Sequence, residues 1–124
     1  MGLLSGMLGT ASEANLDKVE NQIASILVDD ETIEQAYQLI RDMIVLTNKR
    51  IIFIDKQGVT GRKTEYINIP YRAITRYSVE TAGTFDLDSE LKIWVSSHAE
   101  PFCFDFRKTG HVADIVKIIT RYAC

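Results

Sequence analysis

Cysteine and histidine are scarce in this sequence of 124 residues, and the basic residues are outnumbered by the acidic ones. Two cysteines, Cys103 and Cys124, are too few for a disulfide framework, so we expect both to be free thiols in a reducing cytosol. The net charge of −3 argues against general nucleic-acid binding, which needs a basic surface to displace counterions. The apolar start of the chain has no side-chain charge before Glu13, lacks the basic residues of a secretory signal and is too short to span a bilayer. We therefore predict a cytoplasmic protein.

The motifs of common enzymes and cofactor sites are also missing. There is no GxxxxGK[ST] and no GxGxxG sequence, which excludes the usual phosphate-binding loops. His98 and His111 lie far from each other and from either cysteine, so no Cys/His cluster indicates a metal. Asp86, Asp88 and Glu90 resemble a fragment of a calcium loop whose glycine and bidentate glutamate are absent. We predict no catalytic residues, no metal and no cofactor.

The composition is that of one globular domain spanning residues 1–124, with 46% hydrophobic and 25% charged residues. Apolar residues recur at helical spacing near both ends of the chain. The first set is Leu16, Val19, Ile23, Ile26 and Leu27, and the second is Val112, Ile115, Val116, Ile119 and Tyr122. These patterns predict an N-terminal helical extension within 1–30, opened by a capping box of Thr10 and Glu13 and ended by Asp29 and Asp30, and a C-terminal helix over 110–123 capped by Thr109.

Between the two helices, residues 32–107 show the alternation and short spacing of seven strands. The first includes Ile33, Tyr37 and Leu39, and the others are 43–47, 50–55, 65–69, 75–81, 91–95 and 102–106. Pro70 ends the fourth because it has no amide to donate to a ladder. The fold class is therefore mainly β (α+β), an antiparallel barrel or sandwich capped by one helix, with an extra helix at the N-terminus.

The polar residues Thr47 to Arg50 interrupt two apolar runs, and they are either a hairpin corner or a basic binding site. Asn48 favours the hairpin, because asparagine tolerates the left-handed conformation of a two-residue turn. A binding role for Lys49 and Arg50 is the less favoured alternative.

Three stretches, LTNKRIIFIDKQG, IPYRAI and SVETAGTFDLDSELKIW, occur in this order and carry a resemblance over essentially the whole chain. The sequence resembles a bacterial pleckstrin-homology-like (PH-like) family first catalogued as a domain of unknown function. The resemblance implies a single-domain PH fold that assembles into cyclic rings, often of five subunits, and binds other proteins. It brings no catalytic residue with it.

The apolar pattern gives separate support for assembly. Residues 43–46 and 51–54 are apolar on both strand faces, so the outward face needs a cover. The N-terminal helix can cover it in a monomer, or a neighbouring subunit can cover part of it. Trp94 alternates with Leu91, Ile93 and Val95 and is expected to point outward. The predicted interface residues are Trp94, Met43, Val45, Ile52 and Ile54.

Outward polar residues supply two alternative binding surfaces. The first would bind an unidentified protein partner where strands of adjacent subunits meet, through Arg76, Ser78, Glu80 and Lys92. The second would bind anionic lipid through Lys56, Arg62 and Lys63. Each basic residue near an anionic membrane contributes about 1 kcal/mol, so one subunit would adsorb weakly and a ring would bind by avidity.

Overall fold

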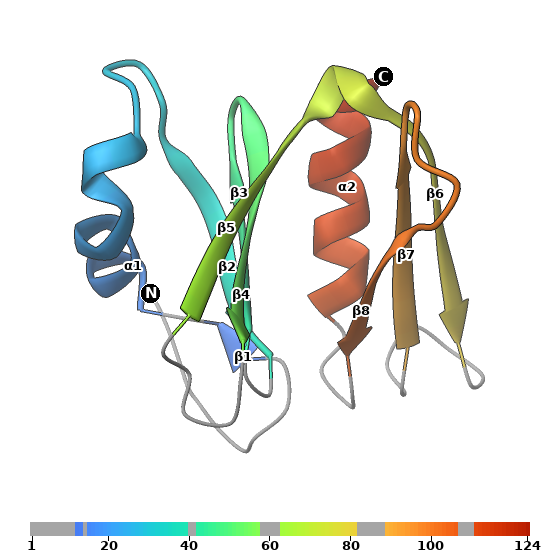
Figure 1. Cartoon of the computed structure of the whole chain (residues 1–124), viewed down its shortest axis with the longest axis horizontal. Coiled ribbons are helices and arrows are strands. Elements are labelled where there is room, and N and C mark those ends of the chain that lie inside the picture. Colours follow the sequence, from blue (N-terminus) through green and yellow to red (C-terminus); the bar gives the residue numbers. More distant parts are fainter. Residues whose placement is uncertain (1–11, 14, 40–41, 58–62, 82–88, 107–110) are drawn as a thin grey trace.

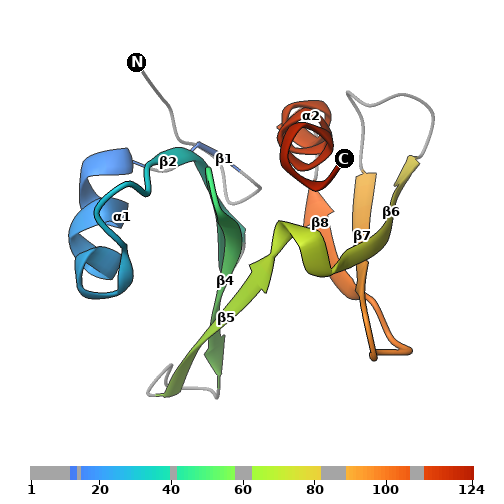
Figure 2. The ribbon, with the colours of Figure 1, turned by 90° about the horizontal axis from the view of Figure 1, so that it is seen from above.

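The computed structural model describes residues 12–13, 15–39, 42–57, 63–81, 89–106 and 111–124. Two antiparallel sheets face each other, and the C-terminal helix α2 closes the space between them (Figure 1). From above, α2 lies over the opening between the sheets while α1 packs on the outside of the larger one (Figure 2). This arrangement is the predicted helix-capped antiparallel barrel.

Eight strands occur in the described part of the chain. The five-stranded sheet has the order β1-β2-β3-β4-β5, and the three-stranded sheet has the order β6-β7-β8. The strands are β1 (Ser12–Glu13), β2 (Ile33–Gln38), β3 (Met43–Thr47), β4 (Arg50–Gln57), β5 (Lys63–Pro70), β6 (Ile74–Thr81), β7 (Ser89–Val95) and β8 (Phe102–Phe106). The helical elements are α1 (Leu16–Ile23), η1 (Ala24–Ile26), η2 (Tyr71–Ala73) and α2 (His111–Ala123). All seven predicted strands are confirmed.

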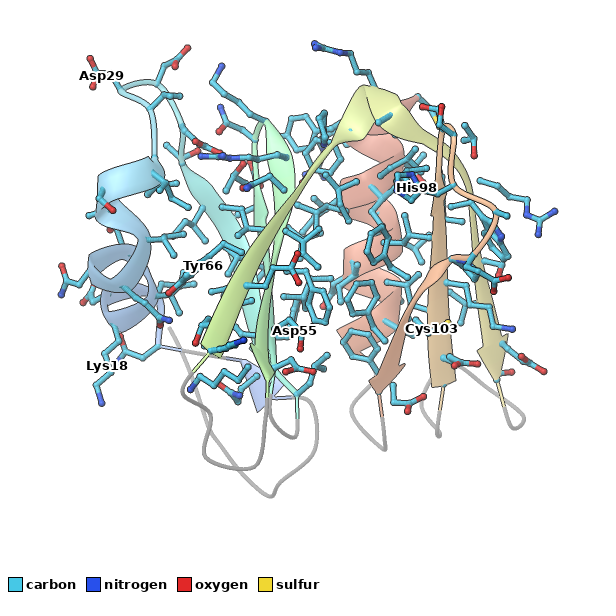
Figure 3. The ribbon with its side chains drawn as sticks, in the orientation of Figure 1. Lys18, Asp29, Asp55, Tyr66, His98 and Cys103 are labelled. Carbon is cyan, nitrogen blue, oxygen red and sulfur yellow. The ribbon has the colours of Figure 1, made fainter. Side chains whose placement is uncertain are left out.

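The main core lies between the two sheets and α2. Inward side chains of β3, β4, β7 and β8 fill it, together with the apolar stripe of α2 (Figure 3). Phe53 and Phe104 meet edge to face with ring centres 4.8 Å apart, and Tyr37 and Phe106 meet similarly at 6.3 Å. Such pairs connect the two sheets by directional aromatic contacts in addition to buried area.

The N-terminal region differs from its prediction. Ser12 and Glu13 form the short strand β1 beside β2, and α1 begins only at Leu16. Asn15 is the N-cap, and its side chain accepts a hydrogen bond from the amide of Lys18 at 3.1 Å. The capping box of Thr10 and Glu13 is therefore wrong for this helix, which ends at Ile23, before the predicted aspartates. Thr10 and the predicted cap Thr109 lie outside the described residues.

A second, smaller core lies on the outward side of the five-stranded sheet. Val19 and Ile23 of α1 pack against Val45, Ile52 and Ile54, which are at most 1% exposed. Helix α1 of the same chain thus covers the outward face of the β3–β4 hairpin. The interpretation that these residues need a neighbouring subunit is wrong, because the helix buries them completely.

Both cysteines lie at the surface of the domain. They are free and exposed, and Cys103 points away from the phenylalanine core as its alternation with Phe102 and Phe104 predicts. No helix in the described segments is long and apolar enough to cross a membrane.

Ser97 adopts positive φ, at 69°, in the turn between β7 and β8. The amide of His98 donates to the carbonyl of Val95 at 3.3 Å, which makes Ser97 the third residue of a four-residue turn. This conformation costs a residue with a side chain about 1–2 kcal/mol, whereas glycine adopts it freely.

We expect Ser97→Gly to raise the free energy of unfolding by about 0.5 kcal/mol, because relief at this φ exceeds the added entropy of the unfolded chain. Urea denaturation measures the change. Ser96→Gly is the matched control, since φ at Ser96 is not positive, and it should lower stability. Equal effects of the two glycines would contradict this account of the turn.

Candidate functional site

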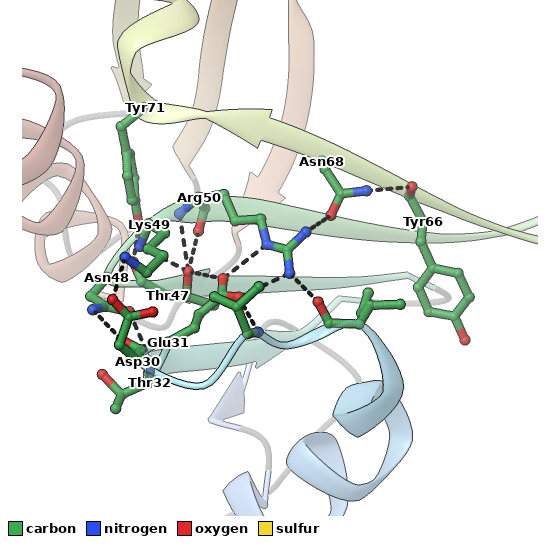
Figure 4. A network of polar contacts seen from close by, with 12 residues as sticks. Asp30, Glu31, Thr32, Thr47, Asn48, Lys49, Arg50, Tyr66, Asn68 and Tyr71 are labelled. Atoms are coloured by element: carbon green, nitrogen blue, oxygen red, sulfur yellow. Dashed lines mark hydrogen bonds and ion pairs between the residues drawn. The ribbon is translucent and has the colours of Figure 1, made fainter.

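The polar corner between β3 and β4 is built around an ion pair between Arg50 and Glu31. Nε of Arg50 donates to Oε2 of Glu31 at 2.8 Å, and Nη2 donates to Oε1 at 2.9 Å (Figure 4). The planar guanidinium thus makes two parallel charged hydrogen bonds. The side chain of Glu31 is 1% exposed and that of Arg50 is 22% exposed, so the pair is largely shielded from water.

The remaining hydrogen bonds of this pair connect separate segments of the chain. Arg50 also donates to the carbonyl of Ile26 at 2.6 Å and to Oδ1 of Asn68 at 3.0 Å. Glu31 also accepts from the hydroxyl of Thr47 at 2.7 Å and the amide of Val28 at 3.2 Å. The pair therefore joins η1 and the connection to β2 with β3, β4 and β5.

Asn48 and Lys49 connect the hairpin tip to the same segment. The amide of Thr32 donates to Oδ1 of Asn48 at 2.8 Å, and Nδ2 of Asn48 donates to the carbonyl of Asp30 at 3.1 Å. Lys49 pairs with Asp30 at 3.1 Å on the exposed surface. Asn48 does not have positive φ, so the predicted reason for asparagine at this turn is wrong. Its amide side chain is needed for these two contacts instead.

Opposing effects act on the pKa of Glu31. Burial raises it, but hydrogen bonds from Arg50, Thr47 and the amide of Val28 outweigh burial and hold the pKa below its usual value. Because every charged group in the corner is paired within the chain, the corner is a structural joint. The alternative in which Lys49 and Arg50 form a basic binding site loses its support.

A different polar surface lies on the outside of the three-stranded sheet. The register pairs Arg76 with Trp94, Ser78 with Lys92 and Glu80 with Glu90, and it continues to β8. We call this surface the outer face of β6–β8: Arg76, Ser78, Glu80, Glu90, Lys92, Trp94, Cys103 and Asp105. It unites all four predicted partner-surface residues with Trp94, which was predicted to belong to a separate contact.

The two cations of this face have different partners. Lys92 lies 3.5 Å from a carboxylate oxygen of Glu80 and 3.9 Å from one of Glu90. Arg76 instead lies over the ring of Trp94, with Cζ 3.9 Å from the ring centre. Such a contact orients the guanidinium and leaves its N–H groups at the edge for an acceptor.

The structure separates the remaining predicted residues. Met43 is partly buried at the margin of the α1 cluster, beside the buried Val45, Ile52 and Ile54. Lys56 and Lys63 are exposed near the same end of β4 and β5, and Arg62 lies outside the described residues. Among the described side chains, no group of three His, Cys, Asp or Glu residues could hold a metal.

An exposed apolar patch was missed by the sequence reasoning. Ile26 is 39% exposed, Val28 52% and Tyr66 39%. Tyr66 pairs across strands with Ile54, which places it on the same face of the sheet as α1, beside the segment that follows the helix (Figure 4). Helix α1 ends at Ile23 and leaves the side chain of Tyr66 uncovered. We call Ile26, Val28 and Tyr66 the apolar patch.

Two antiparallel sheets closed by a C-terminal helix define a PH-like domain, and solved structures share this fold. The sequence matches the family model described as bacterial PH domain over residues 2–123, and the chain belongs to this family. It is 50% identical over 120 residues to the uncharacterized protein YjqA of Bacillus subtilis, covering 96% of each chain.

Two of the similar solved structures come from Shewanella. A DUF1696 family protein with a pleckstrin-homology domain from Shewanella loihica is 48% identical, with a TM-score of 0.84 and coverage of 94% of this chain and 100% of that chain. A pleckstrin-homology domain from Shewanella amazonensis is also 48% identical, with a TM-score of 0.76 and 90% coverage of both chains.

Glu31→Gln should lower the free energy of unfolding at pH 7 by roughly 2–3 kcal/mol, because it leaves the shielded guanidinium of Arg50 without its anion. Since the pKa of folded Glu31 lies below its unfolded value, the stabilisation is complete above pH 4.5 and is lost as the pH falls through the folded pKa. Urea denaturation of both proteins across this range should therefore show the difference shrinking only below about pH 4.5.

Asp30→Asn is the matched control for this experiment. It removes a neighbouring carboxylate that is 78% exposed and pairs with Lys49, so it should cost much less stability than Glu31→Gln. If the two substitutions have equal effects, the Arg50–Glu31 pair is not the joint described above.

Asn48→Gly should destabilise the protein by about 1–2 kcal/mol, because the hydrogen bonds to Thr32 and Asp30 are lost. A glycine would be nearly neutral if the position only required left-handed backbone. Lys49→Ala, which removes an exposed ion pair from the next residue, should change stability by less than about 1 kcal/mol. Chemical denaturation compares the two, and a neutral Asn48→Gly would refute the role of the side chain.

Proposed function

We propose that this domain is a non-enzymatic protein-binding module that forms a closed ring of copies in the cytoplasm, with five subunits. The observation that carries the proposal is the difference between the two sheets. Helix α1 covers the outward side of β2–β4, whereas no described element covers the outer face of β6–β8. That face carries an aromatic residue together with arginine, lysine and carboxylates, a composition suited to contacts with another protein.

The apolar patch supports the ring. It lies toward the α1 end of the long axis of the molecule, and the outer face of β6–β8 lies at the opposite end (Figure 1). A cyclic ring needs a heterologous contact, in which one surface of each subunit meets a different surface of the next. We propose that the apolar patch of one subunit packs against the part of the Trp94 ring that Arg76 does not cover on its neighbour, so that Arg76 stays open to solvent. The rest of the outer face, with Ser78, Glu80 and Lys92, then borders the junction and binds the protein partner.

Weak binding to anionic lipid is a second candidate. Lys56 and Lys63 are both exposed at the same end of the β4–β5 pair. Two lysines contribute about 2 kcal/mol near an anionic surface, so a ring of copies would be needed for lasting attachment. Co-sedimentation with vesicles that contain or lack acidic lipid distinguishes this candidate from protein binding.

The ring is tested by light scattering at micromolar concentration, where the wild-type mass should be about five times the subunit mass of 14.0 kDa. Tyr66→Glu should lower this mass, because it places a charge in the apolar patch, and Trp94→Ala should lower it by removing the opposite anchor. Lys117→Ala, on the exposed side of α2, is the control and should leave the mass unchanged.

Circular dichroism should show the same β-rich spectrum for all three variants, since none of the substituted side chains is buried in the core. A wild-type protein that remains monomeric at high concentration would refute the ring. Protein binding through the outer face would then have to be tested on the monomer.

A further inference from the structure

Arg76 differs from Lys92, the other cation of the outer face, because it lacks a carboxylate partner among the described residues. Lys92 bridges Glu80 and Glu90, whereas Arg76 is exposed and is held over Trp94. Stacking on an indole leaves the guanidinium charged and restricts the conformations of the arginine side chain before a ligand binds. A carboxylate that accepts two hydrogen bonds from the guanidinium edge is its best-matched partner.

Arg76 also lies on a strand with a free edge. The three-stranded sheet has the order β6-β7-β8, so β6 pairs with β7 on one side and with no described strand on the other. From Arg76 to Glu80 its pairing with β7 is regular, after an irregularity between Ile74 and Arg76. A regular edge of this length offers unpaired backbone groups to an extended segment of another protein.

The side chains along β6 indicate the chemistry of such a segment. Arg76, Ser78 and Glu80 follow one another on the outer face, so the edge is positive at one end and negative at the other. Directly opposed residues on neighbouring strands have Cβ atoms about 4.5–5.5 Å apart, which lets a carboxylate on an added strand reach Arg76.

We propose that β6 binds an extended acidic segment of a partner protein as an additional strand, with a carboxylate of that segment paired to Arg76. This inference rests on the proposed protein-binding function and specifies the partner. The chain itself has a net charge of −3, so long-range attraction does not bring an acidic partner to it. The contact must be made at short range, within the Debye length of about 8 Å at physiological salt.

Trp94 allows a direct measurement, because it is the single tryptophan of the chain and lies under Arg76. The probe is a blocked heptapeptide of sequence Thr-Val-Glu-Val-Glu-Val-Thr, which can present glutamate to Arg76 in either strand direction. Its comparison peptide has glutamine in place of both glutamates. We expect the fluorescence titration to give at least about tenfold tighter binding for the acidic peptide, the effect of one charged contact.

Three variants identify the residue responsible. Arg76→Gln should abolish the preference for the acidic peptide, and Arg76→Lys should retain part of it, because charge remains while the planar fork is lost. Arg72→Gln removes the same charge from an exposed residue of η2 and should retain the full preference. Hydrogen exchange should slow in β6 on binding and remain unchanged in β5, an edge strand of the other sheet.

The proposal is overturned by equal binding of the two peptides, by no binding of the acidic one, by a preference that survives Arg76→Gln, or by protection of β5 instead of β6. A fall in the mass of the assembly on Arg76→Gln would overturn it too, because a second copy would then be the partner of Arg76. If the mass falls on Arg76→Gln, or if only the peptide fails to bind, the proposed ring and protein-binding face are not contradicted. A monomeric wild type with normal peptide preference would instead refute the ring alone.

Discussion

The pair between Glu31 and Arg50 determines where the N-terminal part of the molecule lies. Helix α1 has eight residues, below the length of about 12 at which isolated helices become marginally stable, so its position depends on tertiary contacts. Arg50 binds the carbonyl of Ile26 and the carboxylate of Glu31, on either side of the turn that leads from the helix to β2. Each of these contacts spans 19 to 24 residues of sequence. The joint therefore fixes the helix over Val45 and Ile52, which would otherwise face water.

A buried ion pair is an expensive way to make such a joint. Shielding two charges costs several kcal/mol each, and a well-packed apolar pair often gives equal or greater stability. An apolar pair, however, cannot also satisfy the carbonyl of Ile26, the amide of Val28 and the hydroxyl of Thr47 at once. The Ile26 and Val28 groups lie where a turn leaves the helix, and the Thr47 hydroxyl lies at the end of β3; all three would lose a hydrogen-bond partner without the ion pair. The charges thus serve an irregular stretch of backbone that apolar side chains could not accommodate.

The sequence predicts the strands and the helix-capped barrel because both depend on local periodicity, as in the alternation of Tyr77 and Val79 with Arg76 and Ser78. It also indicates that the two-sided apolar strands need a cover, but whether α1 or another subunit provides it depends on contacts far apart in sequence. Asn48 shows the same limit: a turn propensity is local, whereas its bonds to Asp30 and Thr32 are not. The contact of Arg76 with Trp94 required the register of β6 and β7, which alternation alone does not give.

The edge strands β5 and β6 carry charged side chains that protect them against pairing with other strands. Free edges of regular strands attract other strands indiscriminately, and charged side chains and proline are common protections. On β5 these are Lys63, Glu65 and Pro70, and β6 has Arg76 and Glu80. Charges of both signs along an edge disfavour an apolar strand and any strand whose charges fall opposite like charges. The pattern that prevents aggregation therefore also decides which strand can be added.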